Sequence, residues 1–204
     1  MKKIISAVLF CAPLSALAAD ATVDLTFKGT LTQPTCSAAF TGMAGGTDIA
    51  FGNINASDIV GKADNTVITA APVKDVSIQL TGCGGGITRV SLDFVGTALS
   101  GYGFNGAAAS FVDPLNANAL SGLGFAIFKD QTTTSNLEAI SMKAGELEYF
   151  ELANLTKTGE TYKLPLYAKM VVTKNALLNT SAAVNTNSAG KDLSASAYVN
   201  IAYE

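Results

Sequence analysis

The chain has 204 residues, which is enough for one domain of ordinary size, and its formal net charge at pH 7 is −3. It contains neither histidine nor tryptophan, so the commonest general base and every Ser-His or Cys-His catalytic pair are excluded. Arg89 is the only arginine and there is no basic cluster, so the chain does not fit a nucleic-acid-binding protein.

Residues 1–18 have the organisation of a secretory signal peptide. Lys2 and Lys3 form the positive start, residues 4–14 form a short apolar run, and residues 16–18 fit the small-x-small cleavage rule. The apolar run is too short to span a bilayer. We therefore expect an exported protein whose mature part begins directly after this cleavage site.

Two cysteines, Cys36 and Cys83, lie outside the predicted signal peptide. An even number of cysteines in an exported chain indicates a disulfide bond. Two free thiols or half of a metal site remain alternatives at this point. A zinc site is disfavoured because the chain has no histidine and no CxxC motif, and we expect no cofactor.

The first expected strand follows the signal peptide, where residues 23–31 alternate between apolar and polar side chains. One face of this segment carries Val23, Leu25, Phe27, Gly29 and Leu31. A period of two is typical of a half-buried strand. The strand either pairs within its own domain or fills a gap in a neighbouring molecule; the interruption of its apolar face by Gly29 weighs against the first alternative, but both stay open at this point.

Short alternating segments separated by turn residues continue along the chain, a pattern typical of an all-β sandwich. Expected strands lie at residues 48–54, 73–80, 89–95, 124–128, 148–152 and 164–172, with one helical turn at 56–59. The first of these strands contains Gly52, which suggests a bulge or a close backbone approach. Residues 98–121, rich in glycine, alanine and asparagine, are expected to form a long surface loop, and residues 175–190 a polar loop with a helical turn at its start.

The final expected strand, residues 194–203, shows a clear alternation. Val199, Ile201 and Tyr203 share one face with Ala197, and no turn or partner hairpin follows them. The total of about seven strands matches the strand number of an immunoglobulin-like sandwich. The uncovered final strand suggests that it borders a gap in its own fold.

Three features that could carry chemistry have simpler explanations. Residues 101–106 fit G-x-G-x-x-G, but no strand–helix context surrounds them, so a flexible glycine loop is favoured. Glu146, Glu148 and Glu151 are close in sequence, and a solvated strand edge is favoured over a glycosidase pair. No serine or threonine lies in a nucleophile motif, so we expect no enzyme activity.

Several segments together follow the pattern of a known family. They are residues 27–31 followed by Cys36, and residues 49–54, 56–59, 76–83, 124–128 and 164–172. The end of the chain is the most specific part, with Tyr203 in the penultimate position and Gly190 fourteen residues before Glu204. The chain resembles the pilin subunits of chaperone–usher fimbriae, of the type 1 and P pilus class.

This resemblance implies an all-β, incomplete immunoglobulin-like sandwich without its last strand at residues 33–204, preceded by a donor-strand extension at residues 19–32. The implied donor-strand side chains are Val23, Leu25, Phe27, Gly29 and Leu31. The implied residues of the acceptor groove and of chaperone recognition are Gly190, Val199, Ile201 and Tyr203. The resemblance also implies a Cys36–Cys83 disulfide.

The partners that the resemblance implies are neighbouring fimbrial subunits, a periplasmic chaperone and an outer-membrane usher. The implied location is a fimbrium on the surface of a Gram-negative bacterium, reached through the periplasm, where the fimbrium supports adhesion. The alternative is a minor adhesin or binding module that recognises a host glycan or protein through residues 98–121, where Tyr102, Phe104 and Phe111 lie. A tip adhesin would normally add a whole N-terminal lectin domain, so a structural subunit is favoured.

Overall fold

The computed structural model describes residues 35–41, 48–96, 122–134, 138–142, 145–187, 193 and 195–204. The chain divides into two units, Met1–Thr32 and Gln33–Glu204, and the described residues all belong to the second. The predicted signal peptide, the predicted donor-strand extension and the predicted loop at 98–121 therefore fall outside the described residues. No helix in the described part is long and apolar enough to cross a membrane.

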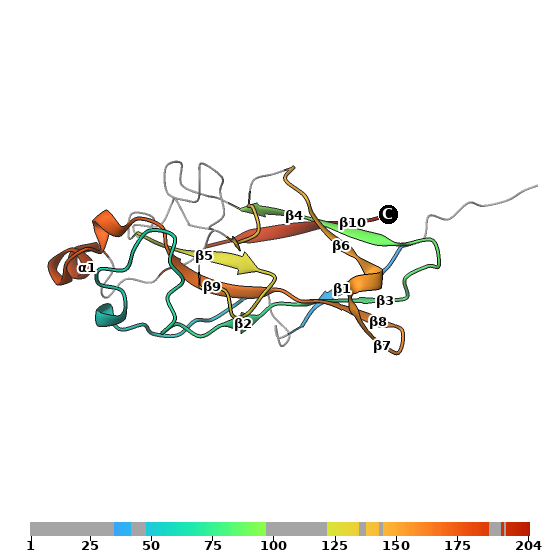
Figure 1. Ribbon diagram of the computed structural model, residues 1–204, viewed down its shortest axis with the longest axis horizontal. Helices are drawn as coiled ribbons and strands as arrows, with labels where there is room; N and C mark the ends of the chain where they lie inside the picture. Colours follow the sequence, from blue (N-terminus) through green and yellow to red (C-terminus); the bar gives the residue numbers. More distant parts are fainter. Residues whose placement is uncertain are drawn as a thin grey trace, which may run out of the picture. The chain divides into compact units, whose positions relative to one another are not determined.

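The described part is all-β, with ten strands in three antiparallel sheets and little helix (Figure 1). The four-stranded sheet has the order β1 (Ser37–Phe40), β3 (Ile78–Thr81), β8 (Thr161–Leu164), β7 (Thr156–Thr158). A three-stranded sheet has the order β10 (Ala197–Tyr203), β4 (Arg89–Gly96), β6 (Glu148–Glu151). The other has the order β2 (Lys74–Asp75), β9 (Tyr167–Val172), β5 (Leu123–Phe128).

The helices in the described residues are short. They are the 3-10 turns η1 (Ala56–Asp58), η5 (Leu152–Asn154) and η6 (Asn175–Leu177), and the α-helix α1 (Ser181–Asn187). The helical turn predicted at 56–59 is confirmed as η1. The region after 175 is more helical than predicted, because α1 buries Val184 against the apolar cluster that includes Ile59 and Leu178.

The strand predicted at 73–80 is two strands in different sheets. β2 pairs with β9, whereas β3 pairs with β1 and β8. The change of sheet occurs at the buried residues Val76 and Ser77, where the Val76 amide donates to the Leu166 carbonyl at 2.9 Å and the Leu166 amide donates to Ser77 Oγ at 3.2 Å. The strand predicted at 164–172 is broken at the same level, at Pro165, which has no amide hydrogen for a ladder.

The strand predicted at 48–54 is wrong, because these residues form no ladder. Gly52 has φ +73°, which takes the backbone out of strand geometry, and a Cβ at Gly52 would meet no atom within 4 Å. The glycine therefore serves a left-handed backbone conformation and not a close approach. Ile49 and Phe51 nevertheless pack against the main core cluster.

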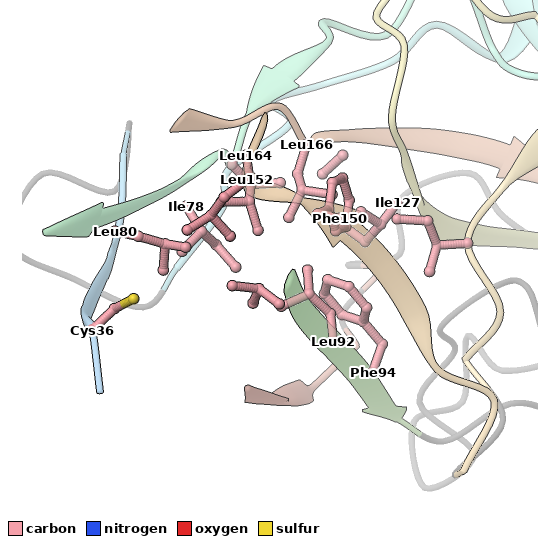
Figure 2. Close-up of a cluster of buried hydrophobic side chains, with 14 of the residues drawn as sticks. Cys36, Ile78, Leu80, Leu92, Phe94, Ile127, Phe150, Leu152, Leu164 and Leu166 are labelled. Carbon is pink, nitrogen blue, oxygen red and sulfur yellow. The ribbon is translucent and has the colours of Figure 1, made fainter. Parts of the chain in front are cut away.

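The core lies where the inward faces of these strands meet, and Figure 2 shows its side chains converging from several strands. The strand predicted at 89–95 is confirmed as β4, and its predicted inward residues Val90, Leu92 and Phe94 are buried, with 0%, 0% and 5% exposure. The predicted strands at 124–128 and 148–152 are confirmed as β5 and β6. The β7–β8 hairpin was not predicted.

Candidate functional site

β10 is hydrogen-bonded along one edge only, within the described residues. That edge pairs antiparallel with β4 (Figure 1). In this ladder Val199, Ile201 and Tyr203 lie opposite Phe94, Leu92 and Val90. No strand of the described residues pairs with the other edge of β10. Among the described residues, the backbone groups along that edge therefore have no ladder partner.

The inward side chains of β10 are only half-buried. Val199, Ile201 and Tyr203 alternate with the exposed residues Asn200 and Ala202, which confirms the predicted period of two. All three inward side chains pack against the same core as their partners on β4. Those partners on β4 are buried, so the two members of each register pair differ in exposure.

The end of β10 is held firmly by residues next to β4. The Glu204 amide donates to the Arg89 carbonyl at 2.8 Å, and the Thr88 and Arg89 amides donate to the Glu204 carbonyl at 2.7 and 2.9 Å. The Arg89 guanidinium also pairs with the Glu204 carboxylate and lies 4.6 Å from the centre of the Tyr149 ring. These contacts hold β10 against β4 without using its open edge.

An apolar cavity of about 600 Å³ lies beside the first half of β10. Its lining comes from β1, from residues 48–51, from Val76, and from β4, β5 and β9. The residues that lead into β10 and the first residues of β10 complete it. The lining residues are Phe40, Asp48, Ile49, Phe51, Val76, Phe94, Phe125, Ile127, Ala168, Leu193, Ala195, Ser196, Ala197, Tyr198 and Val199. Phe94 and Ile127 also belong to the core cluster in Figure 2, so the cavity reaches the core itself.

Phe40 on β1 contributes to the cavity and is 39% exposed. β1 is short, and three attachments hold it in place: the β3 ladder, the Cys36–Cys83 disulfide and the end of the strand at Thr41. The Thr41 amide and Oγ1 donate to the Ser77 carbonyl at 2.7 and 3.0 Å. The Cys36–Cys83 disulfide that the sequence predicted is present, next to the first residue pair of the β1–β3 ladder, Ser37 and Thr81.

Ser77 is in turn held by Asp75. The Ser77 amide donates to the Asp75 carboxylate at 2.9 Å, the Ser77 hydroxyl donates to the same carboxylate oxygen, and Lys163 donates to the other oxygen at 2.9 Å. Burial by itself would raise the pKa of Asp75, but the hydrogen bonds from Ser77 and Lys163 outweigh it and lower that pKa below its ordinary value. The charged Asp75 thus stabilises the point at which β1 is attached.

Tyr203 is the predicted penultimate aromatic residue, and its ring is half-buried on the inward face of β10. Burial raises the pKa of the Tyr203 phenol, because the phenolate is poorly solvated there. Tyr198 on the opposite face of the same strand is 61% exposed. The two tyrosines of β10 therefore lie in different environments, and only Tyr203 packs against the core.

The described site contains some of the predicted residues and several that were missed. Val199, Ile201 and Tyr203 lie together on one face of β10, whereas Gly190 and the predicted donor-strand residues lie outside the described residues. The sequence reasoning missed the cavity residues Phe40 and Ala195. A four-residue strand with the sequence Ser-Ala-Ala-Phe carries little periodicity, so the signal for β1 was weak.

The predicted acidic cluster has ordinary surface partners. Glu148 pairs with Lys129 at 2.7 Å, and the Ser141 hydroxyl donates to Glu146 at 2.7 Å. Within the described ranges, no group of three potential ligands could hold a metal ion. The features that distinguish this region of the molecule are therefore the open strand edge and the apolar cavity beside it.

No family model matches the sequence, and no curated protein matches it either. Among solved structures, the chain is similar to the P pilus rod subunit PapA, with 17% sequence identity and a TM-score of 0.53, over 83% of this chain and 99% of that one. It is also similar to a subunit in the structure of a chaperone–usher pilus, with 16% identity and a TM-score of 0.52, over 91% of this chain and 98% of that one. These similarities show a shared all-β, immunoglobulin-like fold.

Proposed function

We propose that this chain, which has the fold of chaperone–usher pilus subunits, is a structural subunit of a chaperone–usher fimbria. Its groove beside β10 accepts a β-strand from a neighbouring subunit. The observation that carries the proposal is an edge of β10 that no described strand pairs with, next to an apolar cavity of about 600 Å³. Binding by strand addition requires a sheet edge that can form main-chain hydrogen bonds with the incoming strand and pockets that take its side chains. Both features occur together here.

Both features are unfavourable for a free subunit in water. Unpaired backbone groups invite aggregation, and the half-buried side chains of β10 keep apolar surface in contact with solvent. An added strand supplies hydrogen bonds to the edge and apolar side chains to the cavity. Strand addition is an established binding mode, and pilins with their chaperones are among its standard examples.

Residues 19–32 have the composition of such a strand. The four apolar side chains on one face of the segment are Val23, Leu25, Phe27 and Leu31. Burying four such side chains is worth about 6–12 kcal/mol before the costs of association. Gly29 occupies the remaining position on that face, and we assign it to the part of the groove with least room for a side chain.

In the proposed assembly, a periplasmic chaperone first covers the groove of the exported subunit. At an outer-membrane usher, the extension of the next subunit replaces the chaperone strand, and the growing fimbrium reaches the surface of a Gram-negative bacterium and supports adhesion. The Cys36–Cys83 disulfide is compatible with export to an oxidising compartment. It also holds β1, which forms part of the groove.

The test is a complementation melt on residues 33–204 with the disulfide formed. The protein is heated alone and with an excess of each peptide in a panel: residues 19–32 of this chain, N-terminal extensions of P pilus subunits, and a scrambled control. We expect at least one alternating peptide to raise the melting temperature by several degrees, and the scrambled peptide to have no effect. If no donor peptide raises it, the groove is not an acceptor, and a glycan array with the isolated protein would then test the binding-module alternative.

A further inference from the structure

The sheet in which β4 lies between β10 and β6 has an exposed apolar patch on its outward face (Figure 1). Five large apolar side chains are exposed in the described ranges, and two of them, Tyr198 and Tyr149, lie on this face with 61% and 47% exposure. A third, Leu147, directly precedes β6 and is 43% exposed. The other two are Phe40, which lines the cavity, and Val73. An exposed apolar patch among polar residues is typical of a binding surface.

Tyr198 and Tyr149 lie at the two ends of a diagonal across this face, with Asp93 at its middle. Tyr198 is opposite Val95 in the β10–β4 ladder, and Tyr149 is opposite Ser91 in the β4–β6 ladder. Asp93 lies on the same face of β4, two residues from each of these partners. The rise along a strand and the spacing between strands put the Cα atoms of the two tyrosines about 16 Å apart. The two exposed rings therefore flank a central carboxylate.

Short polar side chains lie between the two rings. Ser91 is 2% exposed, and Asp93 and Asn200 lie opposite each other in the ladder. One oxygen of the Asp93 carboxylate accepts the Gly145 amide at 3.0 Å, and the other lies 3.5 Å from the side-chain amide of Asn200. A carboxylate oxygen has two lone pairs, and an asparagine amide carries both donors and an acceptor. Asp93 and Asn200 therefore keep capacity for further hydrogen bonds.

We propose that this outward face binds an extended, neutral oligosaccharide. One sugar ring stacks on Tyr198, another stacks on Tyr149, and the hydroxyl groups between them hydrogen-bond to Asp93 and Asn200. A pyranose has an apolar C–H face and a rim of hydroxyl groups, so it matches exposed aromatic rings with polar side chains between them. The span of about 16 Å corresponds to a tri- or tetrasaccharide. Of these four residues only Tyr198 also lines the cavity, so binding here is a property separate from strand capture.

The charges on this face disfavour an anionic ligand. The charged residues of the outward rows, including the residue directly after β10, are Asp93, Glu151, Arg89 and Glu204. Arg89 is the only cation among them, and it is already paired with Glu204 and stacked 4.6 Å from the centre of the Tyr149 ring. An acidic polysaccharide or an anionic membrane would therefore meet carboxylates that no free cation balances.

The position of Asp93 also disfavours a second copy of this chain as the occupant. A two-fold contact that stacked Tyr198 of one copy on Tyr149 of the other would place the middle of the diagonal on the symmetry axis. The two Asp93 carboxylates would then face each other, and like charges that face each other are destabilising. A neutral sugar presents hydroxyl groups at the same place, and those hydroxyl groups can donate to the carboxylate.

The test is saturation-transfer NMR on the full mature chain, residues 19–204, with defined probes. The neutral probes are linear tetrasaccharides of glucose, galactose, mannose and N-acetylglucosamine, and tetralysine is the charged comparison. We expect at least one tetrasaccharide to bind, with the same affinity at low and high salt because it carries no charge. If none of the neutral probes binds, the proposal is wrong. Binding of tetralysine alone, lost at high salt, would overturn it in favour of a cationic partner.

Variants of the full mature chain then locate the binding. Tyr149→Ala should weaken the affinity at least about fivefold, because it removes a stacking surface, whereas Tyr149→Phe keeps the ring and should bind as well as the original. Asn200→Ala should weaken it about two- to fivefold through the lost hydrogen bonds. Val73→Ala removes an exposed apolar side chain next to β2, in a different sheet, and is the matched control that should bind normally.

The melting temperature of each variant shows whether the domain is folded. If Tyr149→Ala does not fold, Asn200→Ala still decides, because Asn200 is exposed and lies on another strand. Unchanged affinity in the folded variants at Tyr149 and Asn200 would overturn the site on this face. A loss in Val73→Ala equal to that in Tyr149→Ala would also overturn it. None of these outcomes bears on the groove, which the complementation melt tests separately.

Discussion

Ile201 and Leu92 lie opposite each other in the antiparallel ladder of β10 and β4, yet Leu92 is fully buried and Ile201 is not. Both side chains point into the same core cluster. The difference arises because β4 has a strand on each side, β10 and β6, whereas β10 has one only among the described residues. This asymmetry within one register pair locates the place where a further strand would complete the sheet.

The first prediction concerns Gly29 in the extension. Gly29→Leu should prevent polymerisation without unfolding the domain, because the added side chain would enter the part of the groove that we assign the least room. Thr30→Leu, one residue away on the outward face, is the matched control and should assemble. Polymer length is measured by sedimentation and electron microscopy, and stability by the melting temperature of the isolated subunit. Normal polymers from Gly29→Leu would mean that the pocket assignment is wrong.

The second prediction compares the inward and outward faces of β10. Tyr203→Ala removes a half-buried ring from the groove and should weaken strand capture by about 1–1.4 kcal/mol, or roughly five- to tenfold. Asn200→Ala removes a side chain from the exposed face of the same strand, at a residue that does not line the cavity, and should leave chaperone capture nearly unchanged. The measurement is the yield of chaperone-bound subunit in the periplasm. Equal yields from the two variants would count against the role of Tyr203.

The third prediction tests the close approach at Gly122. This residue has φ +78°, and a Cβ there would lie 2.6 Å from the carbonyl oxygen of Lys174. Gly122→Ala should therefore lower the free energy of unfolding by about 2–3 kcal/mol, from backbone strain and the clash together. Gly159→Ala, at φ +59° with no atom within 4 Å, is the control and should cost about 1 kcal/mol. Urea unfolding curves measure both, and equal losses would rule out the clash.

The fourth prediction is a pH dependence at Asp75. The pKa of this carboxyl is lower in the folded state than its ordinary value of 3.8, so the stability that the charged form contributes is complete above that value. It is lost as the pH falls through the lower, folded pKa. Asp75→Asn should therefore be less stable than the original protein at neutral pH, and the two should converge as the pH falls below 3.8.

The measurement is the free energy of unfolding in urea at several pH values. Asp130→Asn is a useful comparison, since the pKa of Asp130 is also lowered, but by hydrogen bonds from Thr132 and not from Ser77. Only Asp75→Asn should also reduce binding of the donor peptide at neutral pH, because Asp75 holds Ser77 and Ser77 holds the end of β1. A difference in stability that did not change with pH would contradict the assignment.

The alternation of β4 and β10 was readable from the sequence, since a period of two is a property of the residues themselves and needs no partner. The same is true of the two cysteines outside the signal peptide, whose even number indicated the disulfide that joins Cys36 and Cys83. The all-β class followed from many short alternating segments. These are local signals, and the structure confirms them.

Other features were decided only by tertiary contacts. The segments at 73–80 and 164–172 each look like one strand in sequence, but each changes sheet where Val76, Ser77 and Leu166 exchange hydrogen bonds across the chain. The sequence of β1 shows almost no alternation of apolar and polar residues. This strand forms because it pairs with β3, because Thr41 at its end donates a hydrogen bond to Ser77, and because Cys36 before it is bonded to Cys83. The cavity is formed by residues from at least four separate segments. A sequence can show which face of a strand is apolar, but which edge stays open depends on long-range pairing, and that pairing creates the groove.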